Sequence, residues 1–155
     1  MRSVPGTYLL IIRSTGCDQI RIGKRGLLSV NPGWYLYVGS ALGPGGVQAR
    51  VLRHLRGSKK LHWHIDFLLA SEALHVEEVW WTHSHDRCEC QWGKSLKMLG
   101  TEVLISRFGA SDCKCLAHLF YAFKLPSHDD LLATLEGSCH CRPIQSLHVE
   151  NIEAS

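Results

Sequence analysis

Two tyrosines, an arginine and a histidine stand in an order that suits chemistry on a phosphate group. Tyr8 and Tyr37 each lie in an apolar run, and Arg50 and His54 follow with a spacing of four residues. A tyrosine hydroxyl has a pKa of about 10 and is a poor base in water, but a nearby positive charge favours the phenolate. This set could position a water molecule or transfer a proton beside a phosphodiester. We therefore predict catalytic roles for Tyr8, Tyr37, Arg50 and His54.

The segment around Arg50 and His54 is strongly basic. Residues 47–62 contain no acidic residue, although the net charge of the whole chain is only +3. A local stripe of positive charge can neutralise several backbone phosphates even when the total charge is modest. The alternative is an ordinary solvated helix face. The side chains that we predict to bind DNA are Arg53, Arg56, Lys59, Lys60, His62 and His64.

The triplets GTY (6–8) and YVG (37–39), followed by the Arg50–His54 spacing and a later glutamate, resemble the GIY-YIG nuclease superfamily. The resemblance covers about residues 6–123. Within the superfamily the chain is similar to the stand-alone Uri-type branch, which also occurs fused to DNA-repair glycosylases. It implies cleavage of DNA that depends on a single divalent ion, Mg²⁺ or Mn²⁺. It also implies that Glu89 binds this ion, and it makes a DNA-repair protein a partner to consider.

The cysteines offer a different kind of site. They include C-x-C pairs at 88/90, 113/115 and 139/141, and Zn²⁺ favours tetrahedral sites of sulfur and nitrogen. Four ligands could come from Cys88, Cys90, Cys113, Cys115 and His118. However, the C-x-C spacing is tighter than that of the usual zinc knuckle, and neighbouring positions on a helix point to different sides. The sequence therefore argues against a structural zinc and favours buried free thiols.

The elements that must position these residues follow from the periodicity of apolar residues. Strands are predicted at 8–13, 20–22, 34–39, 76–82, 102–108 and 116–123, and helices at 47–55, 65–69, 87–99 and 126–135. The first 40 residues then form an antiparallel meander that carries both tyrosines. Arg50 and His54 share one face of a helix, and Glu89 lies on a later helix.

These elements predict an α+β fold, in which helices flank a small antiparallel or mixed central sheet of a GIY-YIG-like kind. We predict one domain over residues 1–136 and an irregular C-terminal tail over 137–155. The apolar runs are shorter than the roughly 20 residues that a membrane span needs, and Arg13 interrupts the first of them. We therefore expect a cytoplasmic protein that binds DNA and does not associate with membranes.

The leading hypothesis is a divalent-metal-dependent endonuclease that hydrolyses DNA phosphodiester bonds in repair or processing. One alternative is a non-catalytic nucleic-acid-binding module with the same fold, and another is a zinc-stabilised interaction domain. The sequence favours the enzyme, because a protein that only binds DNA has no need of an acidic side chain facing a phosphate.

Overall fold

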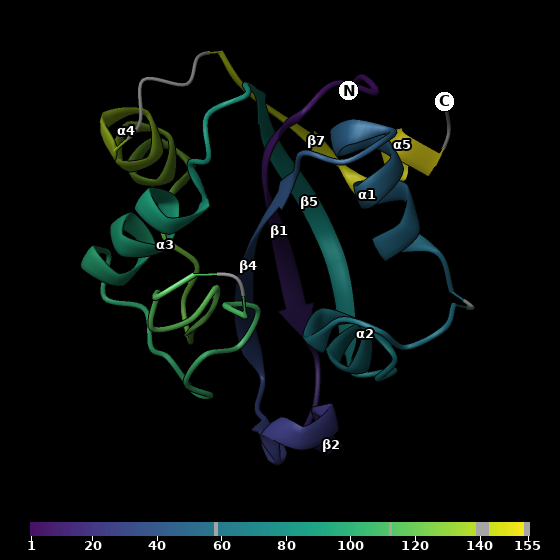
Figure 1. Cartoon of the computed structure of the whole chain (residues 1–155). Helices are drawn as coiled ribbons and strands as arrows, with labels where there is room; N and C mark the ends of the chain where they lie inside the picture. The colour runs from purple at the N-terminus through teal and green to yellow at the C-terminus, as the bar shows by residue number, and fades with distance from the viewer. Residues whose placement is uncertain (58, 112, 139–142, 154–155) are drawn as a thin grey trace.

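A five-stranded antiparallel sheet lies at the centre of the protein in a computed structural model of the chain (Figure 1). The structure describes residues 1–57, 59–111, 113–138 and 143–153. The strands lie in the order β6-β4-β1-β5-β7, and each neighbouring pair is antiparallel. Their bounds are β1 (Gly6–Ser14), β4 (Gly33–Ala41), β5 (Leu74–His83), β6 (Leu119–Ala122) and β7 (Ile144–His148). The predicted α+β class, with a small antiparallel sheet flanked by helices, is confirmed.

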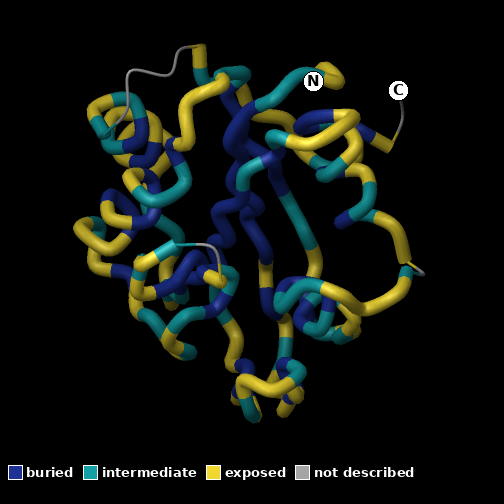
Figure 2. The backbone as a smooth tube through the Cα atoms, in the orientation of Figure 1, coloured by how far each residue is buried: buried dark blue, intermediate teal, exposed yellow. Residues whose placement is uncertain are grey.

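The strand β1 occupies the centre of the sheet, where eight of its nine residues are buried and the run from Tyr8 to Ile12 is continuously apolar. Tyr8, Leu10 and Ile12 point into one hydrophobic core, and Leu9 and Ile11 point into a second core on the opposite face. Successive side chains of a strand alternate between the two faces, and a strand that is buried on both reads as a continuous apolar run. Figure 2 shows the resulting band of buried backbone through the middle of the molecule.

Helices cover both faces of the sheet and enclose the two cores (Figure 1). One face carries α1 (Gly46–Leu55), α2 (His64–Leu69) and α5 (Val149–Glu153), and the other carries α3 (Glu89–Met98) and α4 (His128–Ser138). The sheet separates these two layers, so side chains from α1 and α3 can meet only beside an edge of the sheet. In the described part of the chain, no helix has the length and apolar content of a membrane span.

The short strands β2 (Asp18–Arg21) and β3 (Leu27–Val30) form a separate hairpin, joined by the 3-10 helix η1 (Gly23–Arg25). The sequence predicts a meander here, but β1 pairs directly with β4, with Tyr8 opposite Gly39. The prediction of a meander is wrong because the hairpin packs apolar side chains such as Leu28 against the first core from outside the main sheet.

Two later segments also differ from the prediction. The run 102–108 alternates like a strand, but only Glu102 forms a bridge, to Tyr121. The chain then turns, and Arg107 adopts a left-handed conformation with a φ of 67°. The predicted irregular tail contains β7 and α5 instead. Most side chains of β7 are exposed, so this strand forms through backbone pairing with β5 and leaves little apolar pattern in the sequence.

Candidate functional site

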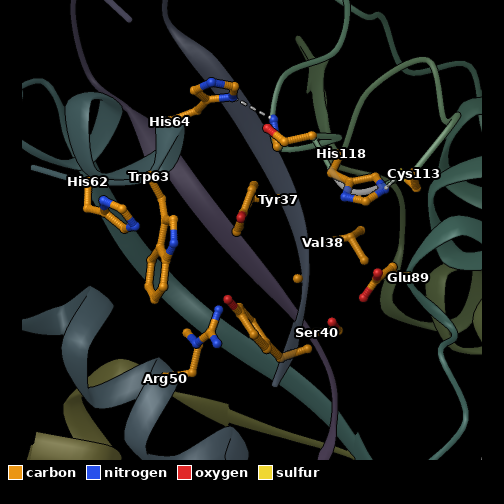
Figure 3. Close-up of a pocket in the computed structure, with 14 residues that line it drawn as sticks. Tyr37, Val38, Ser40, Arg50, His62, Trp63, His64, Glu89, Cys113 and His118 are labelled. Carbon is orange, nitrogen blue, oxygen red and sulfur yellow. Dashed lines mark hydrogen bonds between the residues drawn. The ribbon is translucent and has the colours of Figure 1, made fainter. Parts of the chain in front are cut away.

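A cleft of about 200 Å³ opens beside the end of β4 (Figure 3). The strand β6 pairs with β4 only as far as Leu119, which lies opposite Tyr37. The next residues of β4, from Val38 to Ser40, line the cleft. Figure 3 shows Arg50 and Glu89 on opposite sides of this strand. The cleft is therefore the place where side chains from both helical layers reach a common space.

Tyr8 lines this cleft and is hydrogen-bonded to His54 behind it. The Tyr8 Oη and His54 Nε2 atoms are 2.7 Å apart, and the two residues are 1% and 3% exposed. Burial raises the pKa of Tyr8 well above its usual value and lowers the pKa of His54 to about 3. Both groups are neutral near pH 7, so one proton lies in the hydrogen bond between them. The structure thus brings together two of the predicted catalytic residues in a pair that can pass a proton.

Glycines in both triplets allow this close approach. A Cβ atom on Gly39 would overlap the ring of Tyr8, and a Cβ atom on Gly6 would overlap the carbonyl group of Thr82 in β5. Gly39 lies directly opposite Tyr8 in the register of β1 and β4. The Tyr8 ring therefore lies across the backbone of the neighbouring strand on its way to His54. Packing alone explains why positions 6 and 39 hold glycine.

Arg50 supplies a positive charge to the cleft. Its Cζ atom lies 4.2 Å from the centroid of the Trp63 ring, so the guanidinium stacks on the indole. Burial raises the pKa of both Tyr8 and Tyr37, and the charge of Arg50 only partly offsets this effect. The ring centroids of the two tyrosines are 6.4 Å apart. None of the described carboxylates forms an ion pair with Arg50.

Glu89 faces the same space from the other helical layer. It is the first residue of α3 and lines the cleft. Its negative charge adds to the raised pKa of Tyr8 and Tyr37, which places it within electrostatic reach of both. Its Oε2 atom is buried and has no hydrogen-bond partner among the described residues. An unsatisfied buried carboxylate oxygen is costly, so Glu89 is a candidate for contact with a ligand or water.

Two of the predicted DNA-binding side chains, Arg53 and Lys59, already bind partners within the protein. Arg53 forms a bidentate ion pair with Asp66, and both N–O distances are 2.8 Å. Lys59 donates hydrogen bonds to the carbonyl groups of His54 and Arg56, at 2.9 and 2.8 Å, at the end of α1. These contacts hold α1 and the segment that leads to α2, so neither side chain is free to bind a phosphate without breaking them.

The other predicted DNA-binding residues lie at the surface or in the cleft. Arg56, Lys60 and His62 are exposed. His64 is half-buried, and its Nδ1 atom accepts a hydrogen bond of 2.9 Å from the backbone N–H of Gly109. Sequence reasoning assigned no role at the site to Trp63, which lies between Arg50 and Arg53 with both Cζ atoms 4.2 Å from its ring centroid. An aromatic residue inside a basic run was the signal that could have found it.

A compact group of sulfur and nitrogen atoms borders the cleft. Cys90, Cys113, Cys115 and His118 each offer one ligand atom, and these atoms all lie within 4.8 Å of one another. Three thiols and an imidazole are a donor set that Zn²⁺ prefers, whereas Mg²⁺ and Mn²⁺ prefer oxygen ligands. The prediction of a single Mg²⁺ or Mn²⁺ ion, with structural zinc disfavoured, is therefore wrong.

All four residues were among the five candidate ligands in the sequence, but the argument from C-x-C spacing against zinc is wrong, because the ligands come from two different C-x-C pairs. Cys88 is fully buried in the second core and is disulfide-bonded, so only Cys90 of the first pair contributes. The three ligands of the second segment lie within six residues, at Cys113, Cys115 and His118. That local cluster of three potential ligands was the signal for a metal site.

Comparison with known proteins identifies one family. The family model described as "Domain of unknown function DUF123" matches residues 7–140, which is most of the chain. The match is to this family and not to a GIY-YIG family, so the assignment to the GIY-YIG nuclease superfamily is wrong. No curated protein and no solved structure matches the chain.

Proposed function

We propose, for a chain that belongs to the DUF123 family, that the cleft binds DNA by holding a backbone phosphate against Arg50. The observation that carries this proposal is the contrast between two neighbouring arginines. The Arg53 guanidinium is paired with Asp66, whereas Arg50 is stacked on Trp63, lines the cleft and has no carboxylate partner among the described residues. A guanidinium that is oriented in this way presents a planar set of N–H donors that matches a phosphate.

The surroundings of Arg50 support a phosphate that belongs to a polymer. The Tyr8 hydroxyl, Ser40 and His62 line the same cleft and can offer further hydrogen bonds. Arg56 and Lys60 are exposed on the segment after α1, where they can neutralise neighbouring phosphates along a strand. Glu89 would repel a phosphate on the opposite side, so the bound group is expected on the α1 side of the cleft.

Arg50→Ala tests this proposal in a titration of fluorescently labelled DNA followed by anisotropy over a series of salt concentrations. A charge-assisted contact contributes about 1.5–3 kcal/mol, so the substitution should lower the affinity by about tenfold or more. The slope of log affinity against log salt should fall by about one, because one phosphate contact is lost.

Lys124→Ala is the matched control, because it also removes one cation, here from an exposed position. Lys124 follows β6, whose last residue lies opposite Trp34 at the far end of β4 from the cleft. This variant should bind DNA like the parent. Equal affinity of the Arg50→Ala and Lys124→Ala variants would refute the proposed site, and a parent that binds no DNA would refute the proposed function.

Hydrolysis of the bound phosphodiester is a second candidate function. The specific observation that favours it is the Tyr8–His54 pair on one side and the unpartnered Glu89 oxygen on the other. Hydrolysis requires water to attack phosphorus, a base to accept the proton of that water, and a proton donor for the oxygen that leaves. A neutral hydrogen-bonded pair can relay one proton, and a carboxylate can accept one.

Tyr8→Phe and Glu89→Gln separate hydrolysis from binding, because each keeps the shape of the side chain. If the domain cleaves DNA, each variant should retain most of the DNA affinity and lose about a hundredfold or more of the cleavage rate. The assay uses protein supplied with ZnCl₂ on duplex, nicked, branched and single-stranded DNA, with and without other added divalent cations. A parent that binds but cleaves none of these would leave the domain as a binding module.

A further inference from the structure

The four potential ligands lie at the separations that a tetrahedral zinc site requires. The His118 Nε2 atom is 3.5 Å from the Cys113 sulfur and 4.0 Å from the Cys90 sulfur. With Zn–S bonds of about 2.3 Å and Zn–N bonds of about 2.0 Å, neighbouring S and N ligands of a tetrahedron are roughly 3.5 Å apart. The observed distances therefore need only small side-chain adjustments to accept the ion.

The backbone around these ligands is held in place by Arg107. Its guanidinium donates hydrogen bonds to the carbonyl groups of Cys115, at 2.6 Å, and of Ala110 and Cys113. Its own N–H bonds the carbonyl group of Leu116 at 2.6 Å. One side chain thus binds several carbonyl groups of the segment that carries three of the ligands. These bonds fix the backbone, so metal binding costs less conformational entropy.

His118 is held from both of its sides. Its backbone N–H donates to the carbonyl group of Phe108 at 2.8 Å, and its own carbonyl group accepts from Val38 N–H at 2.9 Å. The Nε2 atom of its ring faces the sulfur atoms of Cys90 and Cys113. The two backbone hydrogen bonds therefore fix the position from which the imidazole reaches the thiols.

We infer that Cys90, Cys113, Cys115 and His118 bind one Zn²⁺ ion, which fastens the 113–118 segment to α3 and thereby fixes one wall of the cleft. The protein supplies all four ligands, so the ion is structural. Cys113 and His118 line the cleft, and Glu89 precedes Cys90 at the start of α3. The bond from Val38 to the carbonyl group of His118 connects the same segment to β4. The effect on DNA binding rests on the function proposed above, whereas the metal site does not.

Metal content tests the site directly. The full chain, purified under reducing conditions and loaded with ZnCl₂ before gel filtration, should carry one zinc per chain by mass spectrometry. Cys115→Ser and His118→Ala should lose it, and Cys17→Ser should keep it, because Cys17 is an exposed free cysteine outside the group. His118→Cys should keep the metal, since a thiolate can replace an imidazole in a zinc site. A parent without zinc, or a His118→Ala variant that retains it, would refute the inference.

Hydrogen exchange and DNA binding test what the ion does to the cleft. On chelation of zinc, the Val38 amide should exchange at least tenfold faster, while the Leu10 amide in the centre of the sheet changes little. DNA affinity should fall and return when ZnCl₂ is added back. Unchanged Val38 exchange would refute the clamp. If the parent binds no DNA, the proposed function fails, but zinc content and Val38 exchange still decide this inference.

Discussion

Burial of His54 beside Tyr8 makes the stability of the fold depend on pH. Burial lowers the pKa of folded His54 to about 3, whereas an unfolded histidine titrates near pH 6.5. Between these values the unfolded chain binds a proton that the folded chain does not bind. The stability that depends on neutral His54 is therefore fully present above about pH 6.5, and it is lost as the pH falls toward about 3.

A His54→Gln variant should show a weaker loss of stability in acid than the parent. Between about pH 4 and 6, one proton of difference corresponds to about 1.4 kcal/mol of unfolding free energy per pH unit. The measurement is urea denaturation at several pH values, which gives the slope of unfolding free energy against pH for each protein. The other histidines contribute equally to both slopes, so the difference reports on His54. Asp66 contributes mainly below this window, because its contacts with Arg53 and the backbone lower its pKa to about 2. Identical slopes would mean that folded His54 accepts a proton as readily as the unfolded residue.

The junction of α1 and α2 depends on one carboxylate. Asp66 is fully buried, pairs with Arg53, and accepts hydrogen bonds from the backbone N–H groups of His62 and Trp63 at 2.9 and 2.8 Å. The same side chain thus holds the arginine that stacks on Trp63 and the backbone at the start of α2. Trp63 is in turn the ring on which Arg50 lies.

Asp66→Asn should destabilise the protein by about 3 kcal/mol, because it leaves the Arg53 charge without its partner and weakens the bonds to the start of α2. DNA affinity should also fall, since the platform beneath Arg50 loosens. Asp130→Asn is the control, because this residue is exposed in the first turn of α4. Chemical denaturation followed by circular dichroism measures the first effect. A midpoint equal to that of the control would show that the ion pair does not support the junction.

Elements with a strong apolar pattern could be predicted from the sequence, and those built by backbone contacts could not. The strands β1, β4 and β5 and the helices α1 and α3 match the predicted segments closely, because each buries a continuous run or a helical stripe. The strand β7 exposes most of its side chains, so its sequence carries little trace of its pairing. Apolar and polar residues alternate over 102–108, but this segment turns, and the Arg107 side chain binds backbone carbonyl groups of the residues that follow. Periodicity alone cannot distinguish such a turn from a strand.

The site shows the same division. The order of the motifs and the helical spacing of Arg50 and His54 pointed to the residues of this region. Tyr8, Tyr37, Arg50 and Glu89 line one cleft, whereas His54 lies behind it, bonded to Tyr8. The sequence could not show that Arg53 and Lys59 are held by contacts within the fold, unlike the exposed cations Arg56 and Lys60, since this depends on partners such as Asp66. The four zinc ligands were among the candidates from the sequence, but their assembly could not be predicted, because Cys90 and the 113–118 segment come together only through the tertiary fold.

The whole molecule depends on its last described segment to close the sheet. The strand β7 covers the outer edge of β5 over five residue pairs, and Ile152 of α5 is buried in the first core. Near the same edge, Glu78 contacts His128 of α4 and His148 of β7 at 3.2 and 3.7 Å. The far end of the chain therefore contributes to the core as well as to the sheet.

Removal of residues 143–155 should lower the melting temperature and promote self-association. The deletion exposes the backbone groups of β5, and an unpaired edge with apolar neighbours is a template for pairing with another chain. Differential scanning calorimetry and gel filtration at several protein concentrations measure the two effects. Zinc content should be unchanged, because all four ligands lie before residue 143. A truncated chain that melts like the parent and stays monodisperse would show that β7 is dispensable.

The central position of β1 has a consequence for synthesis on the ribosome. Both partners of β1 come later in the chain, and the second, β5, ends only at His83. Until that point has emerged, the most apolar segment of the nascent chain lacks one of its neighbours, and the second core still lacks α3 and α4. The central sheet therefore cannot be completed before β5 has been synthesised, and until then the apolar first strand is exposed to non-native contacts of the kind that chaperones prevent.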